Sequence, residues 1–236
     1  MALLLHIETS TEVCSAALAK NGELLFEKEN TEGLNHSELL TVFIEDLFQV
    51  NKISPSEIDA VAVSKGPGSY TGLRIGVSVA KGLCYALDRP LIGISTLDAM
   101  ASFTAQHVQE YFNTSEKNLL FCPMIDARRM EVYSSIYNSE GEQVEPITAK
   151  IIDENSYLEY LKKNKVLFFG NGASKCREKL THPNALFRGP LKASARFMLS
   201  FAEKKYNNRE FEDVAYFEPF YLKDFIATVP KNKIIQ

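Results

Sequence analysis

The sequence predicts an α/β protein built from two similar halves. In the first half, three β-rich stretches joined by short turns precede helices and strands that alternate along the chain. A polar stretch interrupts this pattern at residues 111–118, and the second half then repeats the same order of elements. A chain of 236 residues is long enough for two small domains, which we expect at residues 1–110 and 111–236.

The first half opens with three expected strands and continues with alternating helices and strands. An apolar run leads into the polar turn Glu8-Thr9-Ser10-Thr11, and Asn21-Gly22 is typical of a tight hairpin turn. Apolar residues then recur with a period near 3.6, which predicts a helix. The expected strands are residues 3–7, 13–19, 24–29, 60–63 and 90–94, and the expected helices are 36–50, 69–87 and 96–107.

The second half is expected to contain the same kinds of element. Strands are predicted at residues 119–125, 131–137, 166–169 and 185–187, with a further one at 141–147; helices are predicted at 155–163, 174–180 and 192–206. Two α/β units of this kind are the plan of the actin-like, ribonuclease-H-like fold. The tail, residues 214–227, is rich in aromatic side chains. We expect it to pack onto the body, with a docking strip for another chain as the alternative.

Composition excludes several classes of protein. The net charge of −4 does not fit a domain that grips nucleic acid unaided, so any RNA contact is expected to be shared with a more basic partner. Arg128-Arg129 and Lys204-Lys205 are interpreted as solvated surface rather than as an RNA footprint. The four cysteines form no C-x-x-C pair and lie in apolar stretches, which predicts buried, reduced thiols and a cytoplasmic location. No apolar stretch approaches the length of a membrane span.

Two segments have the composition of anion-binding sites. The first is the turn after the first strand, where backbone N–H groups and small hydroxyls could hold a phosphate, with an ordinary polar hairpin turn as the favoured alternative. The second is the stretch SKGPGSYTGLRIG, in which glycines and proline turn the chain tightly before a helix N-terminus that favours anions. It lacks the ending of a Walker loop. The candidate nucleotide- or anion-binding residues are Glu8, Thr9, Ser10, Gly66, Gly68, Ser69, Thr71 and Arg74.

The first two helices are candidates for a partner interface. At about 100° per residue, the apolar residues of the first helix cover an arc of about 240°, wider than one sheet requires. In the second helix, small residues recur four apart, which permits close approach of another backbone. A deeply buried helix in a monomer is the alternative for the first pattern. The candidate interface residues are Leu39, Phe43, Leu47, Gly72, Gly76 and Ala80.

Catalytic patterns are sparse. No two of the four histidines lie three or four residues apart, so the sequence contains no helical pair of metal ligands, and no G-x-S-x-G elbow is present. Asp126 follows an expected strand and is either a catalytic carboxylate or the opening of a hairpin turn. Gly170-Asn171-Gly172 is either a cradle for an adenosine or phosphate or an ordinary strand-to-helix turn.

The chain resembles the TsaB family, also called YeaZ-type. The resemblance is carried by the segments IETSTEVCSAAL, NHSELL, SKGPGSYTGLRIG and LIGISTLDAMA, and it runs almost continuously from Leu3 to Ala101. In the second half PMIDARRMEVY fits the strand-turn-strand that the family has there, and the remainder matches mainly by element order.

The resemblance implies an actin-like fold of two domains and a shared function. TsaB-type proteins pair with a larger paralogue, TsaD, which holds the catalytic metal through an H-x-x-x-H motif. The pair transfers threonylcarbamoyl from threonylcarbamoyl-AMP, which derives from ATP, to the tRNA adenosine beside the anticodon, and a P-loop ATPase, TsaE, joins the assembly. The resemblance therefore implies that the metal and the threonylcarbamoyl-AMP belong to the partner, and that this chain binds no cofactor tightly and meets tRNA through the complex.

The sequence departs from these relatives at two places that matter for catalysis. The helix after ISTLDAMA carries His107 alone, so it lacks the paralogue's histidine pair, and the first strand ends in Glu8 where the family commonly has aspartate. We therefore expect a non-catalytic partner subunit. A stand-alone actin-like ATPase or kinase is the alternative, a metallopeptidase is disfavoured by the histidine spacing, and a homodimer of the isolated chain that imitates the heterodimer is left open.

Overall fold

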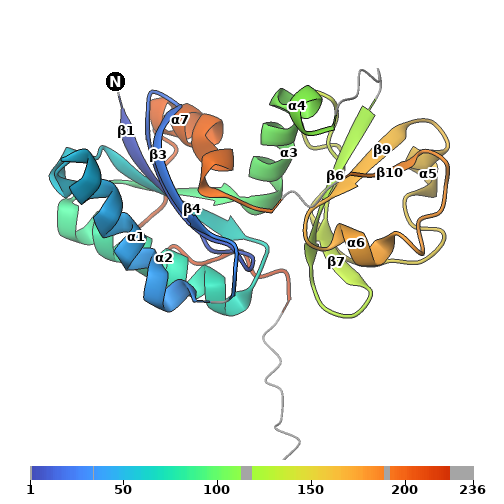
Figure 1. Ribbon diagram of the computed structural model, residues 1–236, viewed down its shortest axis with the longest axis horizontal. Coiled ribbons are helices and arrows are strands. Elements are labelled where there is room, and N and C mark those ends of the chain that lie inside the picture. The colour runs from blue at the N-terminus through green and yellow to red at the C-terminus, as the bar shows by residue number, and fades with distance from the viewer. Residues whose placement is uncertain (1, 34, 113–118, 189–191, 224–236) are drawn as a thin grey trace, which may run out of the picture.

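Two five-stranded sheets form the frame of the molecule, each in its own lobe (Figure 1). The computed structural model describes residues 2–33, 35–112, 119–188 and 192–223. The predicted boundary stretch lies in part, at residues 113–118, outside them. The strands are β1 (Leu3–Glu8), β2 (Cys14–Lys20), β3 (Glu23–Asn30), β4 (Ala60–Gly66), β5 (Leu91–Ser95), β6 (Leu119–Asp126), β7 (Glu131–Ser134), β8 (Thr148–Ile151), β9 (Lys165–Phe169) and β10 (Ala185–Phe187).

The helices lie on both faces of the first sheet and on the second. They are α1 (His36–Asn51), α2 (Tyr70–Leu87), α3 (Thr96–Gln106), α4 (Val108–Phe112), α5 (Leu158–Leu161), α6 (Ala173–Cys176) and α7 (Leu199–Asn207), with short 3₁₀ turns η1 (Pro55–Glu57) and η2 (Ala195–Met198). The side-chain oxygens of Ser69 and Ser95 accept from backbone N–H groups in the first turns of α2 and α3. These hydroxyls explain why both helices begin where they do.

The two sheets have the same topology. In the order β3-β2-β1-β4-β5, the first three strands are antiparallel and the last two join in parallel. The second sheet repeats this plan in the order β8-β7-β6-β9-β10. Because strand order and direction match in both lobes, the duplicated α/β prediction is confirmed, and the fold is the actin-like one.

Three apolar clusters hold the layers together. α1 and α2 cover the outer face of the first sheet, and α5 and α6 pack in the cluster on the second sheet. The largest cluster lies between the lobes and combines α3, η2 and α7 with strands of both sheets. Figure 1 shows α7, from the end of the chain, lying against the lobe that begins with β1. The chain thus returns to its first sheet after forming the second.

The C-terminal segment packs along the first lobe as far as the structure describes it. The ammonium of Lys81 on α2 donates to the carbonyls of Ala215 and Phe217, each at 3.1 Å. An added Cβ at Gly93 would meet the ring of Phe217, so that ring packs closely on β5. The prediction that the aromatic tail packs onto the body is confirmed up to residue 223; Phe225 lies outside the described residues.

The predicted strand at residues 141–147 is wrong. Gly141 adopts a left-handed turn at φ +78°, and Pro146 has no N–H to donate to a ladder. The third strand of this sheet therefore begins only at Thr148. The other discrepancies concern length: the helices expected at 155–163 and 174–180 are single turns, and the last helix starts as 3₁₀ turn η2.

Candidate functional site

A cleft of about 550 Å³ opens between the two lobes, where strands β1, β4 and β6 end. It is lined from both halves of the chain and from the C-terminal segment. The lining residues are Ser10, Thr11, Glu12, Pro67, Gly68, Ser69, Tyr70, Thr71, Ile125, Asp126, Ala127, Arg128, Tyr133, Asn171, Phe220, Tyr221, Leu222 and Lys223. In open α/β sheets ligands bind in the crevice outside the carboxyl ends of the strands, so this cleft is the candidate binding site.

The polar groups of the turn between β1 and β2 form hydrogen bonds with other groups of the same chain. Glu8 is buried, and its carboxylate accepts from the Ser10 N–H at 2.6 Å and from the Ser64 hydroxyl at 2.9 Å. The Thr9 hydroxyl donates to the carbonyl of Gly72 at 2.8 Å. Glu8 and Thr9, two of the candidate nucleotide- or anion-binding residues, therefore do not line the cleft, because their polar groups are bonded inside the lobe.

Burial raises the pKa of the Glu8 carboxyl above its ordinary value of 4.5, although the hydrogen bonds from Ser10 and Ser64 act in the opposite direction. At pH values between 4.5 and the raised pKa of the folded state, the folded chain keeps a proton on Glu8 that the unfolded chain has lost. The stability contributed by Glu8 therefore falls as the pH rises through this range. We expect Glu8→Gln to remove this loss, since the amide oxygen can accept both bonds. The measurement is the free energy of unfolding in urea at acidic and neutral pH.

The test compares the free energy of unfolding of Glu8→Gln with that of the wild type at each pH. The variant should gain on the wild type as the pH rises, because only the wild type has a carboxyl at this position to ionise. A difference in unfolding free energy that stays constant across the pH range would mean that burial does not perturb Glu8.

The second candidate segment forms the start of α2 and lies directly on the first turn. The Ser69 N–H donates to the carbonyl of Ser10 at 2.7 Å, and an added Cβ at Gly68 would clash with that same carbonyl. Ser10, Gly68, Ser69 and Thr71 line the cleft, while Gly66, at φ +104°, lies behind the lining. The structure thus brings the anion-binding candidates together, and binding of an anion there stays a prediction.

Arg74 lies one turn into α2, beside the cleft. Its guanidinium donates to the Tyr70 hydroxyl at 3.2 Å and lies 5.4 Å from the centre of the Tyr70 ring. The Tyr221 ring contacts Tyr70 at a centroid distance of 4.9 Å. Sequence reasoning missed both tyrosines as cleft residues, although Tyr70 stands within the glycine-rich motif and Tyr221 within the aromatic tail.

The row Gly72, Gly76 and Ala80 faces the interior, so its prediction as a surface for a partner helix is wrong. Added Cβ atoms at Gly72 and Gly76 would lie under 3.0 Å from the carbonyl oxygen and the hydroxyl oxygen of Thr9, and Ala80 is fully buried. The small residues admit the chain's own β1–β2 turn. Leu47 is likewise a core residue.

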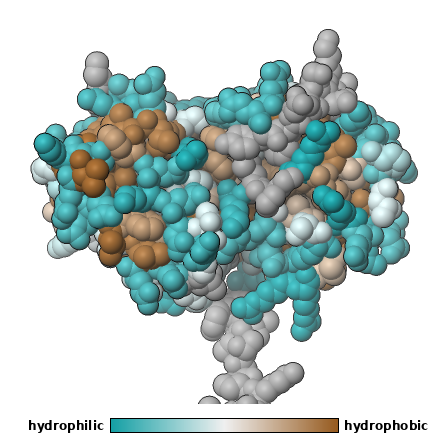
Figure 2. Space-filling view, viewed as in Figure 1, coloured by the Kyte–Doolittle hydropathy of each residue, from teal (hydrophilic) through white to brown (hydrophobic). Residues whose placement is uncertain are grey.

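An apolar groove lies between α1 and α2 on the outer face of the first lobe. It has a volume of about 580 Å³ and is lined by Thr41, Ile44, Glu45, Phe48, Gln49, Lys52, Ile53, Ser54, Pro55, Val79 and Leu83. Leu39 and Phe43 on α1 are half-buried, and an added Cβ at Gly82 would meet nothing within 4 Å. Figure 2 shows hydrophobic surface gathered on the lobe that carries α1 and α2. The outward surface of these helices is therefore still available to a partner.

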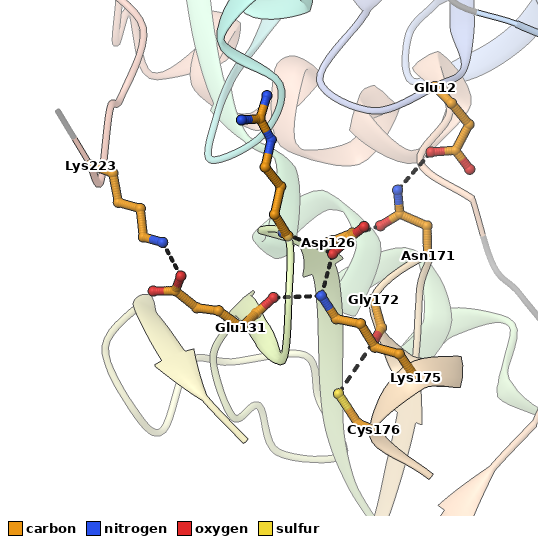
Figure 3. A network of polar contacts seen from close by, with 9 residues as sticks. Glu12, Asp126, Glu131, Asn171, Gly172, Lys175, Cys176 and Lys223 are labelled. Carbon is orange, nitrogen blue, oxygen red and sulfur yellow. Dashed lines mark hydrogen bonds and ion pairs between the residues drawn. The ribbon is translucent and has the colours of Figure 1, made fainter. Parts of the chain in front are cut away.

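Polar contacts in the second lobe continue into the cleft (Figure 3). The Asn171 amide donates to Glu12 at 2.6 Å, and its oxygen accepts from the Asp126 N–H at 3.0 Å. Lys175 forms an ion pair with the Asp126 carboxylate and donates to the carbonyl of Glu131 at 2.7 Å. Asn171 thus connects the lobes, a role that the sequence alone did not indicate.

The turn interpretations of this region are confirmed. The Arg128 N–H donates to the Asp126 carboxylate at 3.0 Å, which is the geometry of a residue opening a hairpin. Added Cβ atoms at Gly170 and Gly172 would collide with the backbone at the end of β6. These glycines are explained by close packing of the β9–α6 turn, and no cradle for an adenosine is needed to account for them.

The four histidines lie in separate places. His6 is buried in β1, where burial lowers its pKa to about 3, and His36 and His107 each approach a backbone carbonyl. His182 accepts from the Asn184 N–H at 3.1 Å. Among the residues that the structure describes, no three His, Cys, Asp or Glu side chains converge where they could hold a metal ion. The four cysteines are buried and unpaired, as predicted.

The fold and the cleft define an actin-like protein in which the turn after β1 is bonded by its own glutamate, since Glu8 accepts from the Ser10 N–H. The family described as "TsaD: tRNA N6-adenosine threonylcarbamoyltransferase" matches residues 31–231. The chain is 32% identical to the tRNA threonylcarbamoyladenosine biosynthesis protein TsaB of Bacillus subtilis, over 72% of each chain, and 29% identical to that of Haemophilus influenzae, over 95% of this chain and 94% of the other.

A solved structure, YeaZ from Pseudomonas aeruginosa, superposes with a TM-score of 0.77 at 27% identity and covers 94% of this chain and 100% of the other. The chain belongs to the TsaB (YeaZ-type) family. No helix in the described part of the chain has the length and apolar character needed to cross a membrane.

Proposed function

We propose that this chain acts in the biosynthesis of threonylcarbamoyladenosine in tRNA, as the non-catalytic partner of a TsaD-type paralogue. It holds and activates the paralogue, which transfers threonylcarbamoyl from threonylcarbamoyl-AMP to the adenosine beside the anticodon. The names of its relatives support the pathway.

The observation that carries the partner role is the apolar groove between α1 and α2. Apolar side chains line most of it, including Ile44, Phe48, Val79 and Leu83, and it lies on the outer face of the first lobe. Apolar surface of this kind on a folded chain is typical of an interaction site. Gly82 lies within one turn of Val79 and Leu83 and lets another backbone approach that face.

A stand-alone ATPase or kinase is not favoured by the cleft. Such an enzyme needs free amides for phosphates and free carboxylates for a metal ion. Here the Ser10 N–H is bonded to Glu8, and the Asp126 carboxylate is paired with Lys175. We therefore assign the metal and the threonylcarbamoyl-AMP to the paralogue, with a TsaE-type ATPase as a third component and tRNA bound through the complex. The buried, reduced cysteines fit the cytoplasm as its location.

The test is reconstitution with the TsaD-type paralogue of the same genome. Light scattering after size exclusion should show a heterodimer, and tRNA modification in the presence of TsaE and threonylcarbamoyl-AMP should require both proteins. The isolated chain should turn over no ATP. Absence of a complex together with full modification by the paralogue alone would refute the proposal, and steady ATP turnover abolished by Glu8→Ala would favour the enzyme alternative.

A homodimer of the isolated chain can be tested in the same experiment. If the same groove serves both contacts, addition of the paralogue should convert the homodimer into the heterodimer. A larger assembly that contains two copies of this chain together with the paralogue would mean that the two contacts use different surfaces.

A further inference from the structure

The mouth of the interlobe cleft presents aromatic rings next to guanidinium groups. The cleft-mouth patch consists of Tyr70, Arg74, Arg128 and Tyr221. Tyr70 is contacted by the Arg74 guanidinium on α2 and by the Tyr221 ring from the C-terminal segment. Tyr221 remains 38% exposed, and Arg128 lines the same cleft from the opposite lobe. Segments far apart in the sequence thus supply two rings and the Arg128 cation to one opening, and Arg74 lies beside it against the Tyr70 ring.

The acidic side chains that the structure describes near Arg128 do not form an ion pair with it. In the described part of the chain its guanidinium has neither a hydrogen bond nor an ion pair, since the nearby acids have other partners. Asp126 is paired with Lys175, Glu131 with Lys223, and Glu12 accepts from Asn171. These pairings leave the Arg128 cation available to a ligand.

The backbone at this turn is also unusual. Arg128 and Arg129 have φ values of +69° and +47°, a left-handed conformation that arginine rarely adopts and that hairpin turns usually assign to asparagine or glycine. Such conformations in residues other than glycine concentrate at functional sites.

Exposed aromatic faces next to arginine are what an unpaired nucleotide requires. Its base stacks on a ring and its phosphate meets a guanidinium, whereas a double helix hides its bases from such contacts. The cleft volume of about 550 Å³ lies within the range of about 300–1,000 Å³ that accommodates small ligands. We propose that the cleft-mouth patch contacts an unpaired nucleotide of RNA. This inference rests on the proposed function, in which the RNA is tRNA.

The position of the patch relative to the groove supports a shared RNA. α2 connects the two, because Arg74 lies at the patch and Val79 lies in the groove. Five residues of helix span about 8 Å along the axis and turn by about 140°, so a partner seated on the groove has to extend around α2 to come near the patch. An RNA strand held mainly by that partner could then reach the rings. The chain's net charge of −4 does not oppose this arrangement, since the partner supplies most of the electrostatic attraction.

The test uses the complex of this chain with its TsaD-type partner and a fluorescent RNA stem-loop with an unpaired loop. Arg128→Asn removes the charge but keeps a residue suited to the left-handed turn, and Tyr221→Ala removes the exposed ring. Tyr221→Ala should raise the dissociation constant about tenfold because it removes a ring on which a base stacks, and Arg128→Asn should raise it by a similar factor because it removes a phosphate contact. Arg128→Asn should also reduce the salt dependence by about 0.7 to 0.9 in log–log slope. The control is Lys179→Ala, which removes an exposed cation paired with Glu154 and should bind like wild type.

Each other outcome overturns the proposal in an identifiable way. Equal binding by all variants, or no binding by the wild-type complex, refutes the contact. If the variants lose as much affinity for a fully paired RNA duplex as for the stem-loop, the contact depends on charge and not on stacking of an unpaired base. Displacement of the RNA by ATP, with the same losses for ATP, assigns the site to a free nucleotide. Pairing with the paralogue is measured for every variant, so its failure in the wild type refutes the proposed function, and its persistence without any RNA effect refutes only this inference.

Discussion

Replacing Gly72 with alanine should lower the free energy of unfolding by about 3 kcal/mol, the upper end of the range for overpacked interiors. The added methyl group would lie well inside van der Waals contact with the carbonyl oxygen of Thr9. That oxygen belongs to the backbone of a turn fixed by two further bonds, between Glu8 and Ser10 and between Thr9 and Gly72, so it cannot move aside cheaply.

The matched control is the same substitution at Gly82 on the same helix. No atom lies within 4 Å of an added Cβ there. Because alanine favours a helix over glycine by about 1 kcal/mol, Gly82→Ala should be more stable than wild type. Thermal unfolding should shift by about 2–4 °C per kcal/mol for a chain of this size. If Gly72→Ala were as stable as wild type, the inward orientation of the glycine row would be wrong, and the row would again be a candidate partner surface.

The elements of the first half could be predicted because local patterns specify them. Serine caps, a tight turn at Asn21-Gly22 and a clean 3.6-residue period mark boundaries that the structure reproduces within a few residues. The second half is less regular. A strand was expected at residues 141–147, but Gly141 and Pro146 interrupt it, and the residues that pair with β7 come later.

The orientation of the small-residue row could not be read from spacing. A period of four shows that Gly72, Gly76 and Ala80 share one face of a helix, but it does not show what covers that face. In the structure the β1–β2 turn covers it. The wide apolar arc of α1 was the better indication of an outward apolar surface. Leu47 is buried in the core, but Leu39 and Phe43 are only half-buried.

The sequence predicted only those residues of the cleft that lie within a local motif. The glycine-rich motif does lie at the cleft, where Ser69 and Thr71 line it. Tyr221, Lys223 and Asn171 come from segments far along the chain, and only tertiary structure brings them to that opening. Sequence spacing also could not show that Glu8 turns inward to bond Ser10, which depends on burial of the first strand.

Replacing Gly82 with tryptophan should block the partner surface without harming the fold. The side chain enters open space in the isolated chain, and tryptophan is a better helix former than glycine, so thermal stability should not fall. In a complex that uses the α1–α2 groove, the ring overpacks the contact at a cost of about 1–3 kcal/mol. Pairing with the TsaD-type paralogue should therefore weaken about 5- to 150-fold, measured as the dissociation constant by calorimetry, and tRNA modification should fall at limiting protein.

A second variant separates this effect from general stickiness of an added ring. Val144 is 50% exposed and lies between β7 and β8 in the other lobe, so Val144→Trp adds a similar aromatic surface far from the groove. It should pair like wild type. If Gly82→Trp also pairs like wild type, the paralogue does not use this face, and the exposed aromatic residues Tyr216 and Phe220 become the next surface to test. If only Gly82→Trp fails, the small residue that matters for assembly is the one pointing away from the chain's own sheet.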